Sequence, residues 1–102
     1  MATVQMSENP DNKTLTISIK GRFDFGTHKE FRAAYNERNG VFSTYIVNMK
    51  EVEYIDSSAL GMLLLLREHV MSCGGKLVIA GSNPEISKIL KIANFDKLFV
   101  IQ

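Results

Sequence analysis

The fold of this chain depends on one stretch, Glu53-Tyr54-Ile55-Asp56-Ser57-Ser58-Ala59-Leu60-Gly61, which lies between two strongly apolar segments. The segment before it, Tyr45-Ile46-Val47-Asn48-Met49, is typical of a buried strand because its apolar run is nearly continuous. The segment after it favours a helix over residues 58–71 that is apolar on most sides and therefore well buried. The stretch is therefore expected to connect a strand to a helix at the carboxyl edge of a sheet, where ligands and partners dock in α/β proteins.

Two strands and a helix are expected before this stretch. Residues Thr14 to Lys20 alternate between apolar and polar side chains, which predicts a half-buried strand. The turn cluster Asn9-Pro10-Asp11-Asn12 makes residues Thr3 to Met6 the other arm of a hairpin. Thr27 is a candidate N-cap for a helix that runs to about Arg38.

After the stretch, the pattern continues to alternate. Gly74-Gly75 breaks the chain before a second buried strand at residues Lys76 to Ala80. Asn83-Pro84 is expected to begin a third helix, with proline at its first position. Residues Leu98 to Ile101 predict a last short strand. Strands alternating with helices indicate a single α/β domain over residues 1–102, whose mixed sheet joins an N-terminal antiparallel hairpin to parallel strands.

Composition narrows the possible functions. The net charge is +1 and the basic residues are scattered, so neither nucleic acid nor a membrane surface is an expected partner. The run Met62–Leu66 is too short to span a bilayer, and residues 1–6 lack the blocks of a signal peptide. With Cys73 as the only cysteine, an internal disulfide and a zinc site of paired cysteines are excluded. A cytoplasmic protein without metal or cofactor is the expectation.

Ser57 is the candidate for chemistry, and three interpretations compete for it. Asp56 or Ser57 could do no more than cap the helix that follows, since Asp and Ser are favoured N-caps. A nucleophilic serine needs a base within reach, and the only histidines are His28 and His69. Because His69 lies about three turns along the same helix, roughly 18 Å away, catalysis is not expected. The third interpretation comes from a family resemblance.

The segments around this stretch resemble the STAS domain family, and its anti-sigma factor antagonists in particular. In that family a strand ends in an apolar residue and Asp-Ser-Ser or Asp-Ser-Thr, followed by a small residue, Leu and Gly, as Val47-Asn48-Met49 and residues 52–61 do here. The similarity extends along nearly the whole chain, to Gly21-Arg22-Phe23-Asp24, Thr27, Gly74-Gly75-Lys76-Leu77, Leu90, Ile92 and the residues from Phe95 through Phe99.

The resemblance implies a mixed sheet with helices packed against it and a phosphorylation site at Ser57. Serine-regulated members accept phosphate on the Ser that directly follows the Asp. The phosphate comes from a partner that is both a serine kinase and an anti-sigma factor, and a separate phosphatase removes it. The residues expected to contact this partner are Asp24, Thr27, Asp56 and Ser58. Ser57, expected as the N-cap outside the first turn, is favoured as acceptor over Ser58.

The resemblance leads to a partner-switching hypothesis, in which the unphosphorylated protein binds the kinase and phosphorylation ends that binding. The alternative is a STAS subunit of a membrane-transport or lipid-transport complex that is not phosphorylated. Two features differ from the family pattern. Ala59 stands where Gly is commoner, and the sequence ends where many members carry one more helix, which bears on partner surface and stability. No large exposed apolar patch is evident, so a monomer is expected.

Overall fold

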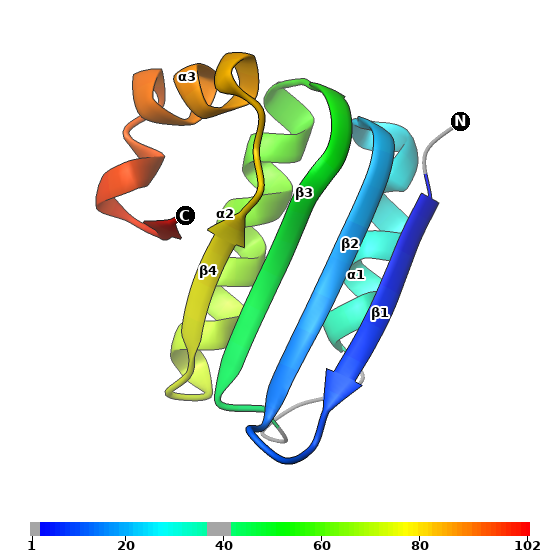
Figure 1. The fold of residues 1–102 in the computed structure, drawn as a ribbon, viewed down its shortest axis with the longest axis vertical. Helices are drawn as coiled ribbons and strands as arrows, with labels where there is room; N and C mark the ends of the chain where they lie inside the picture. The colour runs from blue at the N-terminus through cyan, green and yellow to red at the C-terminus, as the bar shows by residue number, and fades with distance from the viewer. Residues whose placement is uncertain (1–2, 37–41) are drawn as a thin grey trace.

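The elements of the chain follow the predicted order of strands and helices (Figure 1). The computed structural model describes residues 3–36 and 42–102. Its elements are β1 (Thr3–Asn9), β2 (Thr14–Phe23), the 3-10 turn η1 (Phe25–Thr27), α1 (His28–Asn36), β3 (Thr44–Ile55), α2 (Ser57–Ser72), β4 (Lys76–Ala80), α3 (Pro84–Ile92), the 3-10 turn η2 (Phe95–Lys97) and β5 (Val100–Ile101).

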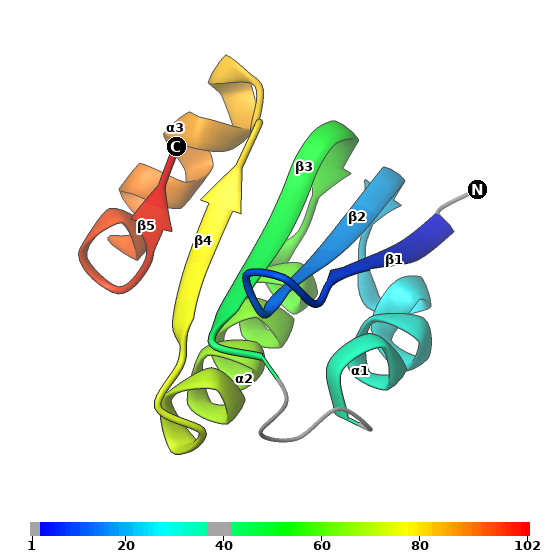
Figure 2. The same cartoon turned by 60° about the horizontal axis from the view of Figure 1, so that its bottom comes forward.

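The five strands form one mixed sheet in the order β1-β2-β3-β4-β5. β1 pairs with β2 antiparallel, and the pairs β2–β3, β3–β4 and β4–β5 are parallel, which confirms the predicted α/β architecture. Helices α1 and α2 lie against one face of the sheet, while α3 follows the carboxyl end of β4 (Figures 1 and 2). In the described residues no helix covers the opposite face.

The core lies between the sheet and helices α1 and α2. Alternation along the strands sends one set of side chains into it and leaves the other set on the open face. The fully buried residues include Leu15 and Ile17 of β2, Tyr45 and Val47 of β3, and Leu63 of α2. The part of the open face that β2 contributes is polar, because its intervening positions are Thr and Ser.

β3 is longer than predicted and continues to Ile55 instead of ending at Met49. Its pairing with β2 shifts register twice, between Ser18 and Lys20 and between Gly21 and Arg22, and β3 gains an extra residue at each shift. The buried positions of β3 are therefore spaced by three, at Met49, Val52 and Ile55. Because two polar residues separate each buried pair, residues 50–55 do not alternate in hydropathy, and the sequence did not predict a strand there.

The first helix begins differently from the prediction. Asp24, and not Thr27, is the capping residue: its side chain accepts a hydrogen bond from the Gly26 N–H at the start of η1. Thr27 ends this turn and is only 1% exposed. The α1 helix follows at His28 and is described as far as Asn36, so its predicted end near Arg38 lies outside the described residues.

Helix α2 was expected to be buried on most sides, and this expectation is wrong. One face is buried and consists of Ala59, Met62, Leu63, Leu66 and Val70. On the other side, Leu64 and Leu65 are exposed, Leu65 by 53%. A helix that packs on one side of a sheet buries a single stripe, whatever the composition of its remaining surface.

Candidate functional site

Two loops meet at the carboxyl ends of β2 and β3. Phe23 and Ile55 are register partners at the ends of these strands, so the residues that follow them, Asp24 and Asp56, emerge at the same edge of the sheet. Adjacent strands lie ~4.8 Å apart, which brings the two loops next to one another. Both Asp residues open a helical segment, Asp24 the turn η1 and Asp56 the helix α2.

Asp56 is the N-cap of α2. Its backbone is extended, and its Oδ1 accepts a hydrogen bond of 3.0 Å from the Ala59 N–H. This bond satisfies one of the free donors of the first turn. Ser57 is thus the first residue of the helix and not its N-cap, which corrects the prediction for this residue. The hydrogen bond that a capping Asp56 should accept from a backbone N–H is present.

Ser57 is exposed, and Ser58 beside it is half-buried. Within the described part of the chain, the Ser57 hydroxyl makes no hydrogen bond, because the capping bond belongs to Asp56. An exposed hydroxyl at the N-terminus of a sixteen-residue helix is accessible to a modifying enzyme and adjoins the positive end of the helix dipole. The structure therefore exposes Ser57 more than Ser58.

The Asp24 loop is held by several hydrogen bonds. Asp24 Oδ1 accepts from the Gly26 N–H at 2.9 Å, and its backbone carbonyl accepts from the Thr27 hydroxyl at 2.7 Å. The second carboxylate oxygen lies 3.4 Å from Nε of Arg22. Thr27 is buried and supports this loop from beneath, so its side chain does not form part of the surface.

Three exposed side chains at this edge were not singled out from the sequence. The Arg22 guanidinium lies over the ring of Tyr54 at 4.1 Å from the ring centre, in a cation–π contact. Phe25 is 70% exposed and stacks on His28 with 5.5 Å between ring centres. The Arg22–Tyr54 contact depends on the strand register, because the two residues are partners across β2 and β3. The sequence carries no local signal for that pairing.

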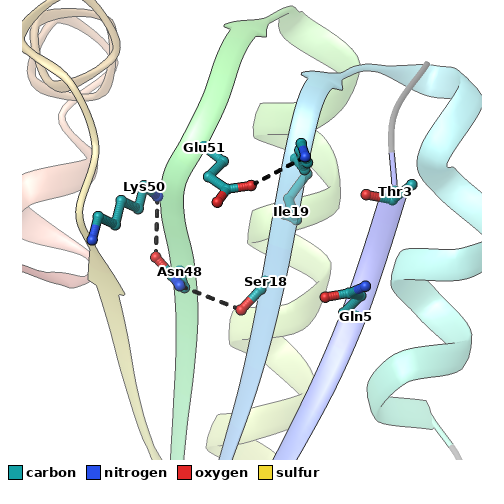
Figure 3. Close-up of a pocket in the computed structure, with 8 residues that line it drawn as sticks. Thr3, Gln5, Ser18, Ile19, Asn48, Lys50 and Glu51 are labelled. Carbon is teal, nitrogen blue, oxygen red and sulfur yellow. Dashed lines mark hydrogen bonds and ion pairs between the residues drawn. The ribbon is translucent and has the colours of Figure 1, made fainter.

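Two surface pockets lie along the strand pair β2–β3 on the open face. The larger, of about 810 Å³, is lined by residues that include Arg22, Tyr54 and Asn83. The other, of about 380 Å³, lies between β1, β2 and β3 (Figure 3). There Asn48 donates to the Ser18 hydroxyl at 3.3 Å and accepts from the Lys50 N–H at 3.0 Å. These polar groups bond to one another, so they do not converge on a ligand position.

The comparison with protein families matches residues 3–102 to the STAS domain. A STAS-domain-containing protein of Pseudomonas aeruginosa is 48% identical over 91 residues, which cover 89% of this chain and 90% of the relative. The chain belongs to the STAS domain family. A match over the whole described chain agrees with the observed sheet order and with the Asp56-Ser57-Ser58 motif at the start of α2.

Solved structures share the fold of this STAS domain. The anti-sigma factor antagonist SpoIIAA in its unphosphorylated form has a TM-score of 0.74 at 19% identity, over 98% of this chain and 87% of that one. The phosphorylated form of SpoIIAA from Bacillus has a TM-score of 0.77 at 19% identity, over 98% of this chain and 91% of that one. The STAS domain of a SulP transporter from Vibrio cholerae reaches 0.74 at 22% identity, over 94% of this chain and 77% of that domain. At these identities the similarity establishes the fold.

Of the two histidines of this STAS domain, His69 lies far from Ser57. His69 is in the last turn of α2, at the opposite end of the helix, with its ring 5.0 Å from that of Tyr35 and 6.0 Å from that of Tyr45. In the described residues no hydrogen bond joins His28 to Ser57. Residues 3–36 and 42–102 also contain no group of three His, Cys, Asp or Glu side chains that could hold a metal ion. None of the described helices is long and apolar enough to cross a membrane.

His69 makes the stability of this domain depend on pH. Its Nε2 is buried and, like the Tyr45 hydroxyl, has no hydrogen-bond partner in the described residues. Burial lowers the pKa of His69 from its usual value of 6.5, so the folded state favours the neutral ring. Its contribution is therefore fully present above pH 6.5 and is lost as the pH falls from there toward the lower pKa of the folded state.

We expect the free energy of unfolding to fall as the pH drops below 6.5, and to fall less in His69→Gln, which cannot gain a proton there. Urea unfolding at several pH values measures this difference. Replacing His28 in the same way is the control. Parallel pH profiles for the wild type and His69→Gln would contradict the assignment, while Ser57-dependent regulation should survive both changes.

The Asp56 cap gives a second prediction. Asp56→Ala removes the acceptor for the Ala59 N–H and should lower the free energy of unfolding by about 0.5–2 kcal/mol. Asp56→Asn keeps an acceptor of similar length and should stay within a few tenths of a kcal/mol of the wild type. Urea titrations compare the midpoints of the three proteins. Equal midpoints for Asp56→Ala and the wild type would show that the cap contributes nothing.

Proposed function

We propose that this STAS domain is a phosphorylation-regulated anti-sigma factor antagonist that acts by partner switching. The unphosphorylated protein binds and sequesters a serine kinase of the anti-sigma type. Phosphorylation of Ser57 by that kinase ends the binding, and a cognate serine phosphatase restores it. In this role the protein is cytoplasmic and catalyses no reaction of its own.

One observation carries the proposal: Ser57 is exposed at the first position of α2, and its hydroxyl makes no hydrogen bond within the described residues. A serine that served only as a helix cap would use its oxygen to accept a backbone N–H. Asp56 already performs that task, so the hydroxyl of Ser57 is free for modification.

The electrostatics of the edge explain how a phosphate could act as a switch. Phosphorylation adds a charge of ~−1.5 to −2 at Ser57. The first-turn N–H groups and the helix dipole favour an anion at this position, so the fold should tolerate the modification. With Asp24 and Asp56 at the same edge, the docking surface would become strongly negative. A partner that fits the unmodified surface would be repelled or left with an unpaired, desolvated charge.

The docking surface that we propose comprises Asp24, Asp56, Ser57 and the exposed part of Ser58. Thr27 contributes indirectly, because its buried hydroxyl holds the Asp24 loop. Similarity to SpoIIAA, solved in both an unphosphorylated and a phosphorylated form, supports a phosphate switch on this fold.

Labelling in a cell extract tests the proposal. The purified protein, incubated with radiolabelled ATP and an extract of its own cells, should incorporate phosphate. Ser57→Ala should abolish the label, whereas Ser58→Ala, the matched control in the same turn, should retain it. Tandem mass spectrometry of the labelled peptide locates the phosphate. Label that persists in Ser57→Ala would overturn the site assignment.

A transport role is the second candidate, because the fold is also that of a SulP transporter STAS domain. A subunit of a membrane-transport or lipid-transport complex needs no hydroxyl at position 57. In that case neither ATP nor the Ser57→Ala change would affect its associations, and the protein would co-purify with a membrane complex. The free, exposed hydroxyl favours partner switching over this alternative.

A further inference from the structure

Within the described residues, no strand pairs with the outer edge of β1. β1 pairs with β2 along all seven of its residues, Thr3–Asn9, and this pairing contains no register shift. β1 is the first strand in the sheet order, and Figure 1 shows no described element beyond it. Its outer side therefore presents a regular row of backbone N–H and C=O groups, which is a template for another strand.

The first five residues of β1 lack the features that normally prevent such pairing. Edge strands are usually protected by charged side chains, especially lysine, by proline, by a bulge or by very short length. Residues Thr3–Ser7 contain no charged residue and no proline, and their pairing with β2 is free of bulges; the one charge of the strand, Glu8, lies beyond them. By contrast, β5 at the other edge has only two residues. The exposed, regular edge is thus specific to β1.

We propose that β1 pairs antiparallel with β1 of a second copy of this chain, with Gln5 opposite Gln5 of the second copy. In this register Val4 faces Met6 of the second copy, and Thr3 faces Ser7. Directly opposite residues point to the same side of a sheet, so the Val–Met pairs lie on the helix side and the polar pairs lie on the open face. Val4 already packs against the core, and Thr3 and Gln5 line the open face (Figure 3).

A second copy suits this edge better than a different protein does. The strand carries one carboxylate and no cation, so it offers little charge with which to select a charged partner. The proposed register instead matches apolar with apolar and hydroxyl with hydroxyl on both sides of a two-fold axis, as an isologous interface requires. Met6, which is 43% exposed in the single chain, would gain an apolar neighbour.

The dimer should be weak. The overlap comprises the five residues Thr3–Ser7 of each chain, well below the ~1,600 Å² of a typical stable interface. We therefore expect mostly monomer at about 10 µM and substantial dimer near 1 mM. This inference does not depend on phosphorylation of Ser57, because Ser57 belongs to α2 and takes no part in the proposed pairing of β1.

Sedimentation equilibrium over this concentration range tests the dimer. Gln5→Lys places two like charges opposite one another at the two-fold axis and should weaken association at least tenfold. The control is Asn12→Lys, an equal change of charge in the exposed β1–β2 turn, and it should associate like the wild type. A wild type that stays monomeric near 1 mM, or a Gln5→Lys variant that associates equally well, would overturn the proposal.

Cysteine cross-linking tests the register separately. Gln5→Cys in a Cys73→Ser background should form a disulfide-linked dimer on mild oxidation, because residue 5 faces itself within the ~4.4–6.8 Å that a disulfide spans. Ser7→Cys in the same background should cross-link at least tenfold more slowly, since its two copies would lie roughly 13 Å apart. Equal rates for the two variants would contradict the Gln5-centred register.

Discussion

Ser57→Asp is expected to weaken binding of the kinase partner by at least about tenfold, whereas Ser57→Ala should bind like the unmodified protein. The carboxylate supplies part of the phosphate's charge at the edge where Asp24 and Asp56 already lie. Alanine adds no charge to this surface and cannot be phosphorylated. In cells the two variants should therefore give opposite phenotypes, with Ser57→Ala permanently active. Isothermal titration with the kinase, recovered by affinity capture on Ser57→Ala, measures the binding.

Ser58 provides the matched control for this switch. It neighbours Ser57 in the same helical turn but is half-buried. Ser58→Ala should leave binding and regulation close to those of the wild type. Should the Ala and Asp variants of Ser57 bind equally well, the switch is refuted, and Ser57 is left with no more than a structural role.

Phe23→Ala should cost about 3–5 kcal/mol of the free energy of unfolding, a large part of the ~5–15 kcal/mol that a domain of this size has. Phe23 is fully buried at the end of β2, with its ring 5.1 Å from that of Phe31 of α1. Its removal leaves a cavity directly beneath the Asp24 loop. The β2 end that positions Asp24 would lose its anchor, so partner binding should fall together with stability.

Phe25→Ala is the matched control, because it removes the same side chain two residues away. Phe25 is 70% exposed, so its loss should change stability by about 0.5 kcal/mol or less. Urea unfolding compares the two variants with the wild type. A Phe23→Ala midpoint as high as that of Phe25→Ala would contradict the packing of the site on this core.

The sequence was sufficient to predict the strand–helix alternation and the mixed sheet, because periodicity records which face of each element is buried. It did not predict the continuation of β3 to Ile55. Two register shifts change the spacing of buried residues there from two to three. The hydropathy of one strand does not show where such a bulge occurs. It also overestimated the burial of α2, since composition cannot tell which side of a helix meets the sheet.

For the site, residue types were predictable and their exact tasks were not. Asp24 and Thr27 are both favoured N-caps, and only the intervening 3-10 turn decides that Asp24 caps while Thr27 is buried. Asp56 likewise occupies the N-cap position of α2 that was expected for Ser57. The contact of Arg22 with Tyr54 arises across strands and could not be read from either strand alone. The outer backbone groups of β1 likewise leave no mark in the hydropathy pattern, and the monomer expected from the absence of a large apolar patch stays a prediction.

The central claim is that a phosphate on Ser57 releases the partner, and one affinity comparison tests it most directly. Phosphoserine can be installed at position 57 during synthesis, and the modified and unmodified proteins can be titrated into the same purified kinase. The account predicts that the phosphorylated protein stays folded and binds at least about tenfold more weakly. Equal affinities of the folded, phosphorylated protein and the unmodified protein would contradict it.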